Sequence, residues 1–408
     1  MAQKKKIPEI RFKEFTDSWS DQPLSYYLAV SEEKNSANQY DKYDIYSVSR
    51  EYGVINQIEY QGKSFAGASL LNYRVVNPNE VVYTKSPLRA QPYGIIKTNK
   101  SDSGIVSALY GVFKPNEEVD PIFVQTYFEL DSRLNEYLRP LVNKGAKNTL
   151  LISDEDSISG NVSFPKKEEQ EKMVKLFTAI DKLIRKLEEK LEKLKNIKQS
   201  LLNQMFTDVN RGGWIPKIRF AGFNEEWKMS TAVDIFKTFD ERNHPELPVL
   251  SATQDRGMVI RESIGFKVQH NRQNEVGYKR VVPGQFVIHL RSFQGGFAHS
   301  SVEGITSPAY TVMSLKESDK QYDYYWKYVL TSRNFIKRLE TVTYGIRDGR
   351  SISYEDFSTL NFLRPNKSEQ ERIACLLKEL DSLFDEQEEK LVKIRNMKAA
   401  LLNKMFTN

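Results

Sequence analysis

The chain has very little cysteine and histidine. Its 408 residues include one cysteine, Cys375, and four histidines. A single cysteine cannot form an internal disulfide, which excludes the disulfide scaffolds of small secreted proteins and is typical of a reducing cytosol. All four histidines lie in the second half, and neither their spacing nor a neighbouring cysteine favours a metal site. They are His244, His270, His289 and His299.

Long apolar runs and cofactor loops are also missing. No segment is apolar for the length of a bilayer, and the opening residues MAQKKK lack the apolar core of a signal peptide, so we expect a cytoplasmic protein. No G-x-G-x-x-G is present. Gly62-Lys63-Ser64 resembles the end of a phosphate loop, but the glycine required five positions earlier is Gln57. The net charge of +6 is compatible with a polyanionic partner without specifying one.

The sequence contains an internal repeat. IPEIRF at 7–12 returns as IPKIRF at 215–220, a displacement of 208, and LLNQMFT at 201–207 returns as LLNKMFT at 401–407, a displacement of 200. Matches at both ends of each half, in the same order, indicate a duplication. The inner portions, about 20–103 and 228–303, match only in fragments. A repeated frame around a variable portion suits a reader of two different targets; neutral drift in loops is the alternative.

After Pro165 the apolar residues recur in alternating steps of four and three, which is typical of a coiled-coil seam. We predict a helix from about 168 to 206, ~58 Å long at ~1.5 Å per residue, and a second over the matching residues. Since the first helix carries the chain from one variable portion to the other, we expect the second to return antiparallel. Cys375, near the start of the second helix, is interpreted as a packing residue. The predicted seam comprises Phe177, Ile180, Ile184, Leu187, Leu191, Leu194, Leu201, Leu377, Leu380, Phe384, Leu391, Ile394 and Leu401.

The variable portions have the pattern of mixed α/β domains. Short β-rich runs end at proline or glycine, and the tracts 121–138 and 321–339 are predicted to be helical. We therefore predict an α+β chain in which two pseudo-symmetric domains are joined by two long antiparallel coiled-coil helices. The predicted divisions are 1–165, 166–207, 208–365 and 366–408.

Together with both openings and the LLNxMFT helix ends, two further segments carry a family resemblance. They are SDEDSISGNVSFPKKEEQ at 153–170 and SYEDFSTLNFLRPNKSEQ at 353–370. The whole chain resembles the specificity subunits of type I restriction-modification systems. The resemblance implies two target-recognition domains, each reading one half of a bipartite, asymmetric double-stranded DNA target. It also implies two methyltransferase subunits and restriction subunits as partners, which carry S-adenosylmethionine, ATP and Mg, while this chain holds no cofactor.

The sequence contains no catalytic loop of its own. Adenine methyltransferases hold the flipped base with Asn/Asp-Pro-Pro-Tyr/Phe, and the closest segment here is Gln91-Pro92-Tyr93. The carboxylates of Asp154 and Asp156 are interpreted as loop caps. We therefore predict a non-catalytic subunit. The alternatives are a stand-alone enzyme, a specificity subunit of a system that cuts on both sides of its site, and a coiled-coil scaffold without an enzyme partner.

DNA contacts are expected from cationic, amide and aromatic side chains of the variable portions. Two tracts follow matching β-rich runs, and two smaller groups surround the repeated glycines Gly145 and Gly345. A solvated surface cation is the alternative for each residue. The candidates are Tyr83, Lys85, Arg89, Lys144, Lys147, Asn148, His289, Arg291, Gln294, Arg347 and Arg350.

Overall fold

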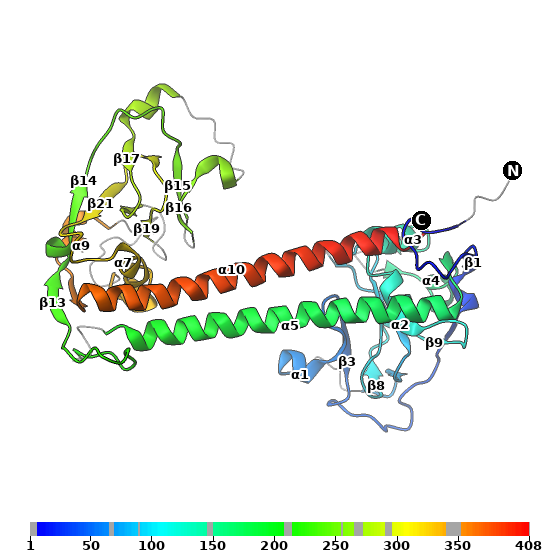
Figure 1. Cartoon of the computed structure of the whole chain (residues 1–408). Helices are drawn as coiled ribbons and strands as arrows, with labels where there is room; N and C mark the ends of the chain where they lie inside the picture. The colour runs from blue at the N-terminus through cyan, green and yellow to red at the C-terminus, as the bar shows by residue number, and fades with distance from the viewer. Residues whose placement is uncertain are drawn as a thin grey trace. The chain divides into compact units, whose positions relative to one another are not determined.

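The computed structural model describes residues 6–64, 69–88, 90–144, 150–207, 214–253, 256–264, 272–289, 296–339 and 352–407, without the side chains of Lys144 and of 272–274. The chain divides into two compact units, residues 1–188 with 389–408, and residues 189–388. Each unit contains one β-rich domain and one part of each long helix (Figure 1).

The first unit is built around a four-stranded antiparallel sheet with three short strand pairs beside it. Its strands are β1 (Ser20–Pro23), β2 (Leu28–Val30), β3 (Tyr46–Ser49), β4 (Gly53–Asn56), β5 (Arg74–Val76), β6 (Val81–Thr84), β7 (Ile95–Thr98), β8 (Gly104–Val106), β9 (Tyr110–Pro115) and β12 (Asn161–Phe164), and a short pair β10 (Asn143–Lys144) and β11 (Leu150–Leu151) lies apart. The sheet order is β2-β9-β6-β7, and the pairs are β1-β12, β3-β4 and β5-β8. Its short helices are α1 (Gln57–Gln61), α2 (Pro121–Tyr127), α3 (Asp131–Leu138) and α4 (Asp154–Ser157).

The second unit repeats this plan. Its sheet order is β14-β21-β18-β19, and its pairs are β13-β22, β15-β16 and β17-β20. The strands are β13 (Lys228–Thr231), β14 (Phe236–Phe239), β15 (Leu250–Thr253), β16 (Gly257–Ile260), β17 (Lys279–Val281), β18 (Phe286–Ile288), β19 (Phe297–His299), β20 (Gly304–Thr306), β21 (Thr311–Leu315) and β22 (Asn361–Arg364). The short helices are α6 (Ala232–Ile235), α7 (Asp323–Leu330), α8 (Arg333–Leu339) and α9 (Tyr354–Ser358). The duplication seen in the sequence is therefore a duplication of the fold, and each tract predicted to be helical forms two helices.

One hairpin differs in length between the two copies. In the β6–β7 hairpin, Tyr83 pairs with Ile96, 13 positions later. In the β18–β19 hairpin, the corresponding pair is Ile288 and Phe297, only nine positions apart. The first copy is thus four residues longer in the connection that follows the strand carrying Tyr83.

The two long helices, α5 (Lys167–Met205) and α10 (Lys367–Lys404), pack antiparallel, as predicted. Two ion pairs in the first unit show the direction. Asp181 pairs with Lys398 at 2.6 Å, and Glu188, further along α5, pairs with Arg395, which is earlier in α10. Of the predicted seam residues, five are buried and the other eight are half-buried. The five buried ones are Phe177, Ile180, Leu187, Leu377 and Leu391.

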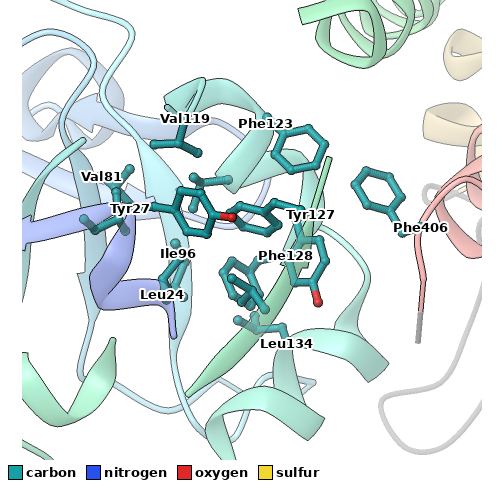
Figure 2. Packing of buried hydrophobic residues seen from close by; sticks show 14 of the residues in the cluster. Leu24, Tyr27, Val81, Ile96, Val119, Phe123, Tyr127, Phe128, Leu134 and Phe406 are labelled. Carbon is teal, nitrogen blue, oxygen red and sulfur yellow. The ribbon is translucent and has the colours of Figure 1, made fainter. Parts of the chain in front are cut away.

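The ends of the helices complete the cores of the β-rich domains. Phe406, just beyond α10, packs on Phe123 and Tyr127 of α2, with ring centroids 5.6 and 5.7 Å apart (Figure 2). Phe206, just beyond α5, packs in the same way on Tyr325 of α7 at 5.5 Å. Aromatic pairs of this kind contribute ~0.5–1.5 kcal/mol beyond their buried area. The repeated MFT ending therefore has a packing role in both units.

Candidate nucleic-acid interface

The repeated opening motif is bound to the start of a long helix in each unit. Arg11 contacts Glu169 with two guanidinium nitrogens, at 2.8 and 2.7 Å, and Arg219 contacts Glu369 in the same way at 2.6 and 2.7 Å. Glu169 is 2% exposed and Glu369 is fully buried. A planar guanidinium matches a carboxylate in this two-bond geometry. The motif IPxIRF thus joins domain to helix, and its arginine is committed to a buried carboxylate.

Two further repeated residues close the same junction. The side-chain oxygen of Gln170 accepts a hydrogen bond from the Asp120 backbone at 2.9 Å, and that of Gln370 accepts one from Tyr322 at 3.0 Å. Both glutamines are fully buried. The repeated frame therefore positions the domains, which leaves the unlike hairpins as the parts that can carry unlike contacts.

Tyr83, the first of the DNA-contact candidates, lies inside the first domain. It is 1% exposed, and its hydroxyl donates to the Tyr93 carbonyl across the hairpin at 2.6 Å. Burial raises the pKa of this phenol. Tyr83 thus ties the two arms of the hairpin together, so in this structure it positions the loop that follows it.

Lys85, next along the same loop, belongs to a buried charge cluster. Its ammonium lies 2.8 Å from Asp154, whose other carboxylate oxygen pairs with Arg74 at 2.5 Å. Asp154 is 6% exposed. The interpretation of Asp154 as a loop cap is therefore wrong. Ser153 is the cap, because its hydroxyl accepts the hydrogen bond from the Asp156 backbone at 2.9 Å, and the Asp154 carboxylate pairs with the two cations instead. Arg74 was not a candidate, since nothing but the fold brings it to a residue 80 positions away.

The second domain has other side chains at these places. Tyr354, at the position matching Asp154, donates its hydroxyl to the Phe236 carbonyl at 2.9 Å. His289, which has the place of Thr84 in the strand register, is half-buried with its ring 6.1 Å from that of Tyr310. The two hairpin bases therefore differ in charge as well as in length.

Most of the other DNA-contact candidates lie outside the described residues. The backbone of Lys144 belongs to β10, but its side chain is not described. These positions stay predictions. The candidates outside the described residues are Arg89, Lys147, Asn148, Arg291, Gln294, Arg347 and Arg350.

The long helices expose apolar residues beside the seam. Leu183 of α5 and Met397 of α10, in the first unit, are 43% and 46% exposed, and Ile197 and Leu383, in the second, are 49% and 44% exposed. Each immediately precedes a position of the four-three repeat (184, 198, 384 and 398, of which 198 and 398 are lysines), which in an antiparallel pair places both helices' residues along the same side of the seam. The four-three repeat in the sequence could have identified these residues, because each is an apolar residue one position before a position of that repeat.

Cys375 corrects one prediction. It is exposed, with its sulfur 3.8 Å from the Glu379 carboxylate. It falls between Ile373 and Leu377, which are the residues that α10 buries, so a packing role is excluded by its place on the helix. Within the described ranges, no group of three His, Cys, Asp or Glu residues could hold a metal ion. No described helix has the apolar length needed to span a membrane.

No family model matches the chain, whereas solved structures do. The S subunit of a type I restriction-modification system from M. genitalium matches with a TM-score of 0.60 and 12% identity, over 98% of this chain and 99% of that one. A chain from a structure of the type I R-M system, described for its complex assembly and conformational transition, matches with a TM-score of 0.51 and 15% identity, over 96% and 98%. This chain therefore has the fold of the specificity subunits of type I restriction-modification systems, with two β-rich domains and a long antiparallel helix pair.

Proposed function

We propose that this chain is the DNA sequence-specificity subunit of a type I restriction-modification complex, and that each β-rich domain reads one half of a bipartite, asymmetric target. One observation carries the proposal. The two domains share strand order and junction contacts but differ in the hairpin after β6 and β18, by four residues in length and by the charge at its base. Two domains that read the same DNA sequence would not need this difference.

The hairpins are proposed to read base edges. The major groove admits a two-stranded β-ribbon, and its base edges are read by Arg, Lys, Asn, Gln, Ser and Thr. Arg291 and Gln294 in the sequence of the second loop are side chains of these kinds, whereas Lys85 in the first is held by Asp154 and positions its loop. The buried ion pairs of Asp154 hold the first loop at its base, so the loop is positioned before DNA arrives.

The helix pair is proposed to set the gap between half-sites. A continuous helix of 39 residues is ~58 Å long, which exceeds one DNA turn of ~34 Å. A change in its length should alter the gap and leave the bases read on either side unaltered.

The same helices are proposed to bind two methyltransferase subunits. Leu183 with Met397, and Ile197 with Leu383, form two like apolar surfaces, one in each unit. Exposed apolar patches at repeated positions indicate a partner that binds twice. The chemistry would then belong to the partners, with S-adenosylmethionine on the methyltransferase and ATP and Mg on restriction subunits, and the chain itself would be non-catalytic.

Co-expression with a methyltransferase partner tests the proposal. Mapping of methylated adenines should give two unlike half-sites separated by a fixed gap. A single continuous palindrome would contradict the two-reader proposal.

The docking surface has its own test in the purified complex. The double variant Ile197→Glu with Leu383→Glu should reduce the number of bound methyltransferases from two to one, as measured by native mass spectrometry. Val392→Glu is the matched control, because Val392 is equally exposed, at 49%, but does not precede a seam position. Equal loss in the control would remove the assignment of this surface.

A further inference from the structure

A pocket of about 340 Å³ opens in the first unit between the recognition domain and α10. Strand β7 and the turn between α2 and α3 form one wall, and residues 395–402 of α10 form the other. Four cationic side chains line it, Arg50, Lys97, Arg395 and Lys398, against two anionic ones, Glu129 and Asp131. The lining therefore carries two more positive than negative charges.

Lys97 is the unusual member of this lining. It is 8% exposed, and burial lowers the pKa of its ammonium below the usual range. Its ammonium forms no hydrogen bond and no ion pair with any residue that the structure describes. A cation that is largely desolvated and has no direct partner is costly, so a negative group bound in the pocket would stabilise it.

The carboxylates around the pocket are already engaged. Glu129 pairs with Lys398 at 2.5 Å, and Lys398 also pairs with Asp181 at 2.6 Å. Asp131 pairs with Arg50 and accepts a hydrogen bond from Gln91 at 2.5 Å. Glu129 attracts Lys97 through space, but it remains beyond ion-pair distance. The described part of the chain thus supplies Lys97 with attraction but with no direct partner.

We propose that this pocket binds a phosphate-sized oxyanion, which contacts the Lys97 ammonium and is flanked by Arg50 and Arg395. Arg50 pairs with Asp131 and Arg395 pairs with Glu188, each through one guanidinium nitrogen, and the remaining N–H groups of both are planar donors that match phosphate oxygens. The site is specific to the first domain, because the position of Lys97 is Ala298 in β19. The oxyanion is either free phosphate, including a nucleotide's, or a phosphate of the DNA backbone. The proposal does not depend on which bases the domains read.

Thermal unfolding of the full chain in phosphate, against chloride of equal ionic strength, tests the site. A ligand that binds only the folded state raises the midpoint. Phosphate should raise the midpoint of the wild type and of Lys97→Arg, and the rise should vanish in Lys97→Met. In chloride, Lys97→Met should be at least as stable as the wild type, because it removes an unpaired buried charge and keeps the methylene packing. Lys114→Met is the matched control, an exposed lysine of strand β9 in the same sheet, and it should keep the full rise.

Calorimetry then separates the two sources. Inorganic phosphate and adenosine monophosphate probe the free oxyanion, and a short DNA duplex probes the backbone. If phosphate binding depends on Lys97, the oxyanion is free. If only duplex binding depends on Lys97, the oxyanion is a phosphate of the DNA backbone. The salt dependence of duplex binding should then be lower by about one phosphate contact in Lys97→Met. Equal responses of wild type and Lys97→Met to all three probes would overturn the proposal.

Discussion

The two β-rich domains are alike in the contacts that join them to the starts of the long helices and unlike in several of their other contacts. The Arg11–Glu169 and Arg219–Glu369 pairs match in partners, geometry and burial. In contrast, the carboxylate of Asp154, which neutralises two cations in the first domain, is replaced by the neutral hydroxyl of Tyr354. The duplicated domain has thus kept the contacts that hold it in place, whereas contacts around its loops differ between the copies.

Charge burial follows the same division. In the first sheet, Lys97 is buried on β7, where the second sheet has Ala298 on β19. One position further, the second domain places His299 against Asp323 at 2.7 Å, whereas Thr98 in the first domain donates its hydroxyl to the Pro121 carbonyl. The same strand in the same sheet thus has an ionic partner in one copy and a neutral one in the other.

The largest effect is expected when the variable portion of one domain is exchanged. Replacing residues 20–145 with the corresponding part of a relative should change one half of the methylated sequence and leave the other half intact, because the second domain keeps its own hairpin. Methylation mapping in cells with the cognate methyltransferase measures both halves at once. A change in both halves would mean that the domains do not read independently.

The helix seam should be the next most sensitive part. Leu187 is 9% exposed, and loss of a buried leucine alone costs ~2–5 kcal/mol. Leu187→Lys adds the cost of burying a charge, so the helix pair should separate and complex assembly should be lost. Circular dichroism during denaturant unfolding and size-exclusion chromatography with the partner measure this. Glu189→Lys, at an exposed position of the same helix, should assemble normally.

The junction pairs test whether the two copies are held equally. Arg11→Ala and Arg219→Ala each leave a buried glutamate without its partner, and each should destabilise its own unit by about 3 kcal/mol. Hydrogen exchange, resolved by unit, would show the loss in residues 1–188 for one variant and in 189–388 for the other. Lys166→Ala should cost almost nothing, because its pair with Asp17 is exposed. Unequal losses would show that one junction is weaker.

The smallest expected effect is a pH dependence of stability that comes from a histidine of the second domain. The first half of the chain contains no histidine. Hydrogen bonds to Glu246 and Glu241 raise the pKa of His244 above its usual 6.5. A folded pKa above the unfolded one adds stability that is present in full below pH ~6.5 and is lost as the pH rises through the folded value. An NMR titration should give a midpoint above 6.5, and His244→Gln should remove this pH dependence. A midpoint at or below 6.5 would exclude the bonds in solution.

Local patterns predicted much of this fold. The steps of four and three predicted α5 to within one residue at each end, and the tracts 121–138 and 321–339 were predicted to be helical where α2, α3, α7 and α8 lie. Cys375 shows where such patterns fail. It lies two residues from Ile373 and was interpreted as a packing residue, but its place on the helix leaves it exposed. Contacts between distant residues could not be predicted. Arg74 meets Asp154, and Lys97 lies in a pocket formed in part by α10, only because the sheet brings them there.

The ion pairs between α5 and α10 limit how the two copies can diverge. Asp181 pairs with Lys398 in the first unit, and Lys198 pairs with Asp381 in the second. Each helix contributes one aspartate and, 17 positions later (198 minus 181), one lysine, so an insertion between them in one helix alone would put one pair out of reach. Only a matching insertion in the other helix would restore both. We therefore expect the two helices to keep equal lengths between these residues, whereas a hairpin such as β6–β7 has no such counterpart and is four residues longer than β18–β19.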